Sequence, residues 1–184
     1  MSKDKLSKRD LVLVAASEVV IEHGAAQLTL DAVVNNAGVS KGGLLYHFPN
    51  KEALIAGMIE KSLLDFEAHL QQVYDSLPIQ KGRWLKAFVI ATFDDTTVTP
   101  RILAASMAAV ANQPDLLIPY KDTLSSWHNK ATTDDFDSQL AEIIIAATNG
   151  AWFERIFWKD PTQDRLKKHL LYLIDTQTIG DANA

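Results

Sequence analysis

The chain has 184 residues, of which 47% are hydrophobic and 22% are charged, so we expect a folded globular protein rather than a disordered one. It contains no cysteine, which excludes disulfides, thiolate metal sites and thiol chemistry and is typical of a reducing compartment. The net charge of −5 is unevenly spread: residues 1–51 carry six Lys or Arg and five Asp or Glu, whereas residues 52–184 carry twelve and eighteen. Any anion-binding surface is therefore expected near the N-terminus.

No segment is typical of a targeting or membrane-spanning element. The first eight residues are mostly polar, and the apolar stretch after them is interrupted by Ser17, Glu18 and Glu22. No apolar run reaches the roughly 20 residues that a membrane helix requires. We expect a cytoplasmic protein without a membrane partner.

Helical periodicity runs through most of the chain, and no segment alternates like a half-buried strand. The expected fold is therefore all-α, with about nine helices. The first helix is predicted over residues 7–23 and stops at Gly24. Thr29 is placed to cap a short second helix, which stops at Gly38.

The third and fourth helices follow at once. Ser40 is placed to cap the third, which Pro49 ends, and Asn50 to cap a long fourth helix from Lys51 to about Leu77. Prolines and polar runs separate five further helices. These are predicted over residues 81–93, 100–112, 115–129, 137–158 and 162–178. We divide the chain into an N-terminal domain, residues 1–52, and a C-terminal domain, residues 53–184.

Gly42 and Gly43 stand in the first turn of the third helix, although Gly costs about 1 kcal/mol relative to Ala inside a helix. Two short helices joined by a tight turn are typical of a helix-turn-helix, whose second helix lies in the major groove of DNA. Without side chains, the two glycines let the backbone approach phosphates and base edges, and the free N–H groups of a helix start favour an anion. The pattern predicts double-stranded DNA as a partner.

Helical phase divides the third helix into two sides. Leu44 and Phe48, four residues apart, are expected to face the core. Thr29 and Lys51 begin the flanking helices, where a hydroxyl and a charge can bind the same DNA backbone. The outward side carries Lys41, Leu45 and Tyr46, with His47 at its border.

The segments IEHG and TLDAVVNNAGVSKGGLLYHFPNKEAL stand in an order and spacing that resemble the DNA-binding domain of the TetR family of transcriptional regulators, over residues 6–54. The resemblance implies DNA contacts at eight matching positions. One position departs from the family: Leu45 stands where many members have Tyr, so a phosphate contact is lost or replaced by apolar contact, for example with a thymine methyl. With Leu45 added, the expected contacts are Thr29, Ser40, Lys41, Gly42, Gly43, Leu45, Tyr46, His47 and Lys51.

The resemblance further implies a homodimer formed through the last two helices. The sequence agrees with a dimer, because SQLAEIIIAATNGAWFERIFW is apolar on more than one face. Two copies hold their recognition helices about one DNA turn (~34 Å) apart, which suits a palindromic operator. The apolar positions of the expected interface include Ile143, Ile144, Ala147, Phe153, Ile156, Phe157, Leu166, Leu170, Leu173 and Ile174.

In such regulators the C-terminal domain also encloses a pocket for a small-molecule effector. Aromatic side chains at helical spacing are more often core than pocket, so both interpretations stay open for each residue. An apolar ligand oriented by a few polar groups suits the composition. The candidates are Trp84, Phe88, Phe93, Met107, Trp127, Asn149, Trp152 and Phe153. The five histidines show no metal-ligand spacing, so no metal and no cofactor is expected.

Three functions compete. The leading hypothesis is a dimeric, ligand-responsive DNA-binding regulator, a repressor that releases its operator when the effector binds. The second is an architectural or protein-recruiting DNA-binding protein without an effector. The third is a helical enzyme, which the sequence disfavours because it contains no nucleophile elbow, phosphate loop, metal spacing or cysteine. We therefore expect no enzymatic activity.

Overall fold

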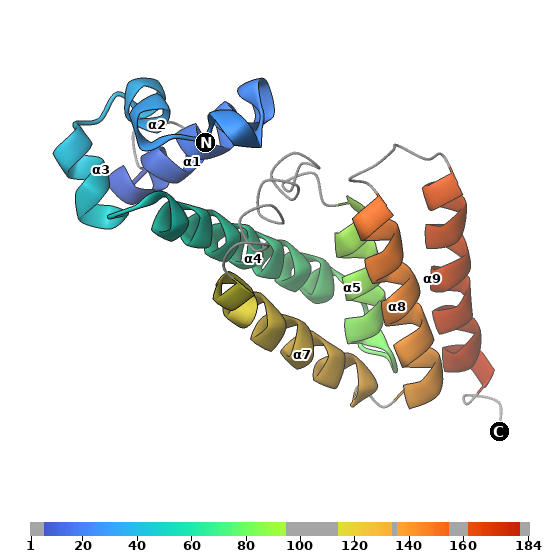
Figure 1. The fold of residues 1–184 in the computed structure, drawn as a ribbon. Helices are drawn as coiled ribbons and strands as arrows, with labels where there is room; N and C mark the ends of the chain where they lie inside the picture. The colour runs from blue at the N-terminus through green and yellow to red at the C-terminus, as the bar shows by residue number, and fades with distance from the viewer. Residues whose placement is uncertain (1–5, 95–113, 134–135, 155–161, 181–184) are drawn as a thin grey trace. The chain divides into compact units, whose positions relative to one another are not determined.

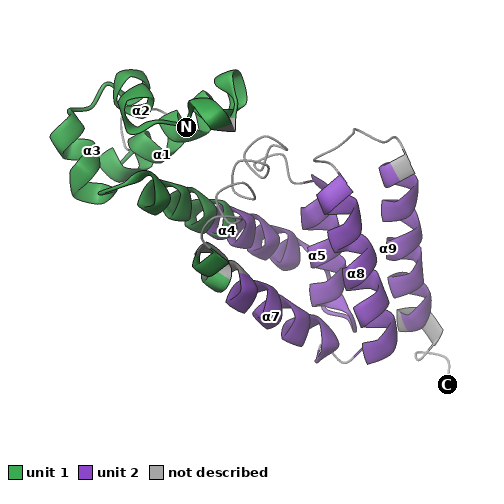
Figure 2. Ribbon diagram, in the orientation of Figure 1, with its two compact units in different colours: residues 1–63, 98–120 green, residues 64–97, 121–184 purple. Residues whose placement is uncertain are grey.

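The computed structural model describes residues 6–94, 114–133, 136–154 and 162–180. In these ranges it contains eight α-helices and two short 3-10 turns and no strand, which confirms the all-α prediction (Figure 1). The chain divides into two compact units, residues 1–63 with 98–120 and residues 64–97 with 121–184 (Figure 2). The helix expected over 100–112, with its pocket candidate Met107, lies outside the described residues.

The first unit is built from short helices at the N-terminus. Its elements are α1 (Lys8–His23), the 3-10 turn η2 (Ala25–Gln27), α2 (Leu30–Ala37), α3 (Lys41–His47) and the part of α4 (Lys51–Ser76) that ends at Leu63. Aliphatic side chains from all four helices form one buried core, joined by a single aromatic residue, Phe48. The stripe predicted on the first helix faces this core: Val12, Leu13, Ala16, Val19 and Val20 are buried.

Side chains cap the start of each helix in this unit. The hydroxyls of Thr29 and Ser40 accept hydrogen bonds from the amides of the third residue after each, both at 3.1 Å. Asn50 does the same for α4 through its Oδ1 at 2.7 Å. Gly24 and Gly38 stop α1 and α2 with φ of 86° and 65°, a region that disfavours any residue with a Cβ. The predicted caps and stops are confirmed.

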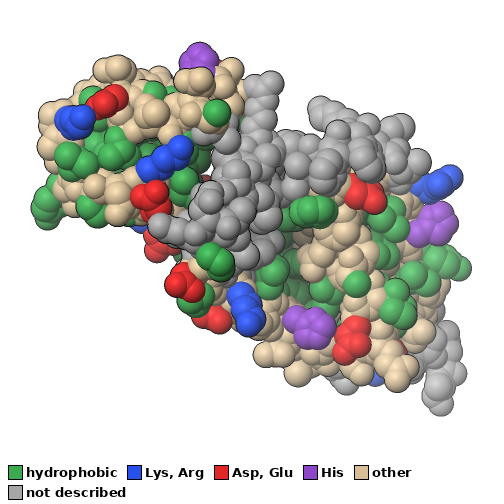
Figure 3. Space-filling view, in the orientation of Figure 1, with side chains coloured by type: hydrophobic (Ala, Val, Ile, Leu, Met, Phe, Trp, Pro, Cys, Tyr) green, Lys and Arg blue, Asp and Glu red, His purple; other side chains and the backbone are tan. Residues whose placement is uncertain are grey.

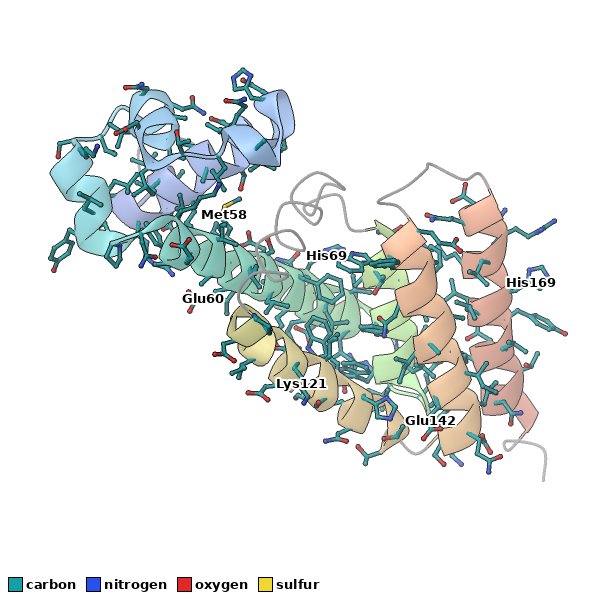
Figure 4. All side chains as sticks on the ribbon, viewed as in Figure 1. Met58, Glu60, His69, Lys121, Glu142 and His169 are labelled. Atoms are coloured by element: carbon teal, nitrogen blue, oxygen red, sulfur yellow. The ribbon has the colours of Figure 1, made fainter. Side chains whose placement is uncertain are left out.

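A close contact joins the end of α3 to α4. Phe48 is buried against Gly57, where a Cβ atom would lie only 2.6 Å from Cε1 of the Phe48 ring. The Arg9 guanidinium lies 5.5 Å from the centre of the same ring and pairs with Glu60 of α4, labelled in Figure 4. Gly57 therefore allows α4 to pack directly against Phe48, the residue that ends α3.

The second unit has longer helices. It contains α4 from Leu64 onward, α5 (Arg83–Asp94), most of α7 (Ile118–Thr132), α8 (Ser138–Glu154) and α9 (Thr162–Gly180), with α5 packed against both α8 and α9. Its centre is an aromatic cluster whose ring centroids lie 4.9–6.2 Å apart. The cluster consists of Phe66, Trp84, Phe88 and Trp127.

Two predicted boundaries in this part differ from the structure. The helix expected over 115–129 starts with a 3-10 turn, Pro114–Leu117, and continues as α7 to Thr132. The polar run NKATTDD is predicted to mark a helix boundary, but α7 continues through its first residues: Ala131 is fully buried, and the Thr132 and Thr133 hydroxyls donate to carbonyls of the last turn. The helix that was expected to reach residue 158 is described as far as Glu154, and residues 155–158 lie outside the described ranges.

Candidate nucleic-acid interface and second-unit cavity

The α3 helix presents a buried side and an exposed side. Leu44 and Phe48 are 0% and 3% exposed, which confirms the predicted inward face. On the opposite side Tyr46 is 83% exposed and Leu45 is 38% exposed. A large aromatic ring left in water on a short helix is available to a partner, and a tyrosine can both stack and hydrogen-bond.

His47 stands at the border, as its helical phase predicted. It is half-buried, and its ring contacts the Tyr46 ring edge-on with centroids 5.0 Å apart. The Phe48 ring lies 6.4 Å from it on the buried side. The His47 ring therefore lies between the exposed Tyr46 ring and the buried Phe48 ring and contacts both.

The two glycines of α3 have different surroundings. A Cβ at Gly42 would meet nothing within 4 Å, so the fold of this unit does not require glycine there. A Cβ at Gly43 would lie 3.1 Å from the Ser40 hydroxyl, which is tight against the helix cap. Gly42 is exposed, and its missing side chain leaves the first turn of α3 open to an approaching surface.

The hydroxyl groups of the two capping residues can still donate a hydrogen bond. Thr29 and Ser40 are exposed and use an oxygen lone pair to accept from their own helices, so each O–H is left to donate to an outside acceptor such as a phosphate oxygen. Lys51, the first residue of α4, is half-buried. Three helix starts in one unit thus each carry a candidate phosphate-contacting side chain.

Asp31, a charged residue near these positions, was absent from the sequence prediction. The Lys41 ammonium lies 2.7 Å from Oδ1 of Asp31, in the first turn of α2. The two residues are ten positions apart, on different helices, so helical phase gives no sign of the pair. Lys41 is an expected DNA contact, and its charge is already engaged within the protein.

The second unit contains a small cavity between α5, α7 and α8. Four of the predicted effector residues line it, Trp84, Phe88, Trp127 and Asn149, together with Leu124, His128 and Ile145, which the sequence prediction missed. The cavity volume of about 10 Å³ is close to the least that one water molecule needs. The parallel rings of Trp84 and Phe88, 5.4 Å apart and inclined by 11°, fill much of the space between the helices.

The other predicted effector residues do not line this cavity. Phe93 and Trp152 are half-buried, and Phe153 is 45% exposed on α8. The polar groups among the lining residues include the His128 ring, the Asn149 amide and the Trp127 indole, whose N–H donates to Glu67 at 3.3 Å. An aromatic cavity with a few polar groups matches the composition of small-molecule sites.

The outer sides of α8 and α9 expose apolar side chains, which are visible in the space-filling view (Figure 3). Ile143 and Tyr172 are 63% and 64% exposed, and Leu173 is 38% exposed. Ala146 and Gly150 are exposed on the same side of α8 as Ile143, and such small residues allow another helix to approach closely. Three residues of the apolar stripe predicted for an interface lie instead in the core of their own unit: Ile144, Leu170 and Ile174. Helical phase places these residues on an apolar side of their helix, but it does not indicate which neighbouring element covers that side.

The described ranges hold no group of three or more His, Asp or Glu that could bind a metal ion. None of the helices described is both long enough and apolar enough to cross a membrane.

Comparison with known proteins matches an N-terminal and a C-terminal segment of the chain to one family, the family that the sequence resembles. A family profile described as "Bacterial regulatory proteins, tetR family" matches residues 12–58, and one described as "Tetracyclin repressor-like, C-terminal domain" matches residues 82–178, more than half of the chain. A transcriptional regulator from Rhodococcus sp. Rha1 has a similar fold, with a TM-score of 0.73 and 20% identity over 95% of this chain and 97% of that one.

Two curated relatives come from Mycolicibacterium smegmatis (strain ATCC 700084 / mc(2)155). The HTH-type transcriptional activator FasR is 31% identical over 87 residues, 47% of this chain and 39% of FasR. The HTH-type transcriptional regulator EthR is 19% identical over 120 residues, 65% of this chain and 55% of EthR. The chain thus spans about half the length of these relatives, or less.

Proposed function

Because the chain belongs to the TetR family of bacterial transcriptional regulators, we propose that it is a repressor that binds a palindromic operator as a homodimer and releases it when a small molecule binds the second unit. Transcription regulation through a helix-turn-helix domain is common to the family and holds for this chain. Dimerisation, the effector, the direction of regulation and action in the cytoplasm are parts of the proposal, and so is the absence of catalysis.

The exposed side of α3 is the observation that supports DNA binding in this proposal. Tyr46 projects into water from a helix whose opposite side is locked into the core, beside an open glycine turn and capped helix starts. In a helix-turn-helix such a helix enters the major groove. We assign Lys51, Thr29 and Ser40 to phosphates and Tyr46 to base edges, with the other predicted residues around them.

The test separates these two kinds of contact. A random duplex pool is enriched on the protein at fixed moderate salt, and binding to the enriched and random duplexes is then followed by fluorescence anisotropy. Lys51→Ala should weaken binding to both duplexes equally and reduce the salt slope by about 0.9 per bound copy, whereas Tyr46→Ala should weaken binding to the enriched duplex more. Lys121→Ala on α7 is the control, because it also removes one lysine charge but lies outside the helix-turn-helix. Equal losses on both duplexes for Tyr46→Ala would contradict base contact by Tyr46.

The exposed apolar side chains of α8 and α9 support the dimer. Two copies that bury Ile143 against each other would form a four-helix interface and present two recognition helices to one palindrome. Ile143→Glu should convert the dimer to a monomer in sedimentation at micromolar concentration. Ile79→Glu is the matched control, because Ile79 is 92% exposed and lies outside these helices. An unmodified chain that sediments as a monomer would contradict the proposal.

The cavity of the second unit supports the proposal that a small-molecule effector binds there. Its aromatic and aliphatic lining suits a small, largely apolar molecule, and His128 and Asn149 can orient one polar group of that molecule. The effector would favour a conformer whose two recognition helices no longer match the half-sites.

Compounds that quench tryptophan fluorescence should also release the enriched duplex, and Asn149→Leu should change their relative affinities. Release by a compound that acts equally on a Trp84→Leu variant would contradict this site. Occupancy of many genomic sites without any effector response would favour the architectural alternative.

Activation is the second candidate for the direction of regulation, because the relative FasR is named an activator. A reporter gene placed behind the enriched operator distinguishes the two. Higher expression after deletion of the regulator supports repression, and lower expression supports activation.

A further inference from the structure

The pair between Lys41 and Asp31 places a negative charge within the expected DNA-contacting surface. Lys41 is the first residue of α3, and Asp31 lies two residues after the Thr29 cap of α2. Their charged atoms are 2.7 Å apart, and the side chains are 60% and 71% exposed.

Stability alone gives little reason for this pair. An ion pair so exposed contributes about 0 to 1 kcal/mol, because water and salt screen both charges. Asp31 is favourable at the start of α2, whereas Lys41 is unfavourable at the start of α3, where the helix dipole is positive. Any residue that caps or favours the α2 start would serve folding as well, so the position of this carboxylate beside Lys41 needs another reason.

The electrostatic effect of the pair on DNA binding is larger. A phosphate that approaches α2 and α3 meets a lysine whose ammonium already has an anionic partner, and it meets the Asp31 carboxylate itself. Affinity for the DNA backbone depends on the number of cations that replace counterions. The carboxylate therefore competes with phosphate for Lys41 and also repels the duplex.

We propose that Asp31 is an internal competitor for phosphate that limits the affinity of the α2–α3 surface for DNA of any sequence. It acts through Lys41, so it is a positioning residue rather than a contact. The inference rests on DNA binding by the helix-turn-helix. Its consequence is that the operator complex depends more on base contacts and less on ionic ones, which keeps the affinity within the range that an effector can reverse.

The test measures anisotropy of a fluorescent random-sequence duplex across a salt series. Asp31→Asn should tighten binding at 0.1 M salt by roughly fivefold to tenfold per bound copy and steepen the salt slope by about 0.9, the value of one ionic contact. Lys41→Ala should weaken binding, because it removes a cation and leaves a carboxylate facing the phosphates. The double variant should fall between the two single variants.

Two controls keep the result specific. Asp122→Asn removes one exposed carboxylate from α7 in the second unit and should leave the salt slope unchanged if the effect is local. Asp31→Ala should behave like Asp31→Asn, and thermal melting confirms that both variants stay folded.

The outcomes separate this inference from the proposed function. Unchanged or weaker binding by Asp31→Asn would overturn it, since the carboxylate would then be neutral or would orient Lys41 productively. Tighter binding to the enriched operator alone would also overturn it, because Lys41 would then read bases rather than phosphates. No binding by the unmodified chain would overturn both the inference and the contacts assigned to α3.

Discussion

The two units differ in what holds them together. Aliphatic side chains and capped helix ends hold the described part of the first unit, and Phe48 is the one aromatic residue in the core cluster there. A cluster of four aromatic side chains holds the second, and three of them, Trp84, Phe88 and Trp127, line a cavity near the size of one water molecule. Caps and glycines fix where a backbone lies, whereas large rings can rotate and repack. A surface that binds DNA needs a fixed backbone, whereas a site that admits a ligand needs side chains that can repack.

The largest effect is expected in the aromatic cluster. Phe88→Ala should destabilise the second unit by about 3–5 kcal/mol, because it removes a buried ring that contacts three others. All four tryptophans of the chain lie in the second unit, so tryptophan fluorescence reports the unfolding of that unit, while circular dichroism reports both.

Leu44→Ala is the matched variant of the first unit, since Leu44 is equally buried. It should shift the circular dichroism transition and leave the fluorescence midpoint in place. Identical shifts of both signals in both variants would show that the units unfold together and would break the contrast between them.

The next largest effect is expected where α4 meets Phe48. Gly57→Ala should destabilise the first unit by about 1–3 kcal/mol, because its Cβ would overlap the Phe48 ring and force α3 or α4 to shift. Denaturant titration followed by circular dichroism measures the change. A variant as stable as the unmodified chain would mean that the ring moves aside at little cost and that this backbone contact is not rigid.

A smaller effect is expected at the N-terminal cap of α3. Ser40→Ala should cost about 1 kcal/mol, because the Gly43 amide loses its acceptor at a helix start. Its control is Ser126→Ala, at an exposed position on α7, which should stay within about 0.5 kcal/mol. Melting curves compare the two, and equal effects would argue that the cap adds nothing to helix position.

The smallest change in stability is expected at Gly42, with the opposite sign. Gly42→Ala should stabilise the first unit by up to about 1 kcal/mol, because the added methyl group meets nothing and Ala favours the helix. The same variant should weaken DNA binding if the open turn contacts the duplex. Unchanged affinity in anisotropy would show that the glycine does not serve DNA approach.

Sequence reasoning succeeded where the cause is local. Thr29, Ser40 and Asn50 each cap a helix within three residues of themselves, and Gly38 stops one through its own φ, so neighbouring letters suffice. Contacts between different helices were missed, such as Gly57 of α4 with Phe48 at the end of α3 and Lys41 of α3 with Asp31 of α2. For the second unit, sequence reasoning selected four of the cavity residues as apolar or polar candidates. Those candidates were chosen by residue type, and neither residue type nor periodicity indicates whether an apolar side chain faces the cavity, the core or the surface.

The size of the cavity has a kinetic consequence. The proposed effector, if larger than a water molecule, would enter only when Trp84 and its neighbours have moved, so the open form would have to exist before binding or be created by it. If opening comes first, the observed binding rate will level off at high effector concentration, at the rate of ring movement. The measured affinity will then be lower than that of the open site by the fraction of molecules that are open. Under the proposed function, substitutions that loosen the stack of Trp84 and Phe88 would make the chain more sensitive to the effector without adding a contact to it.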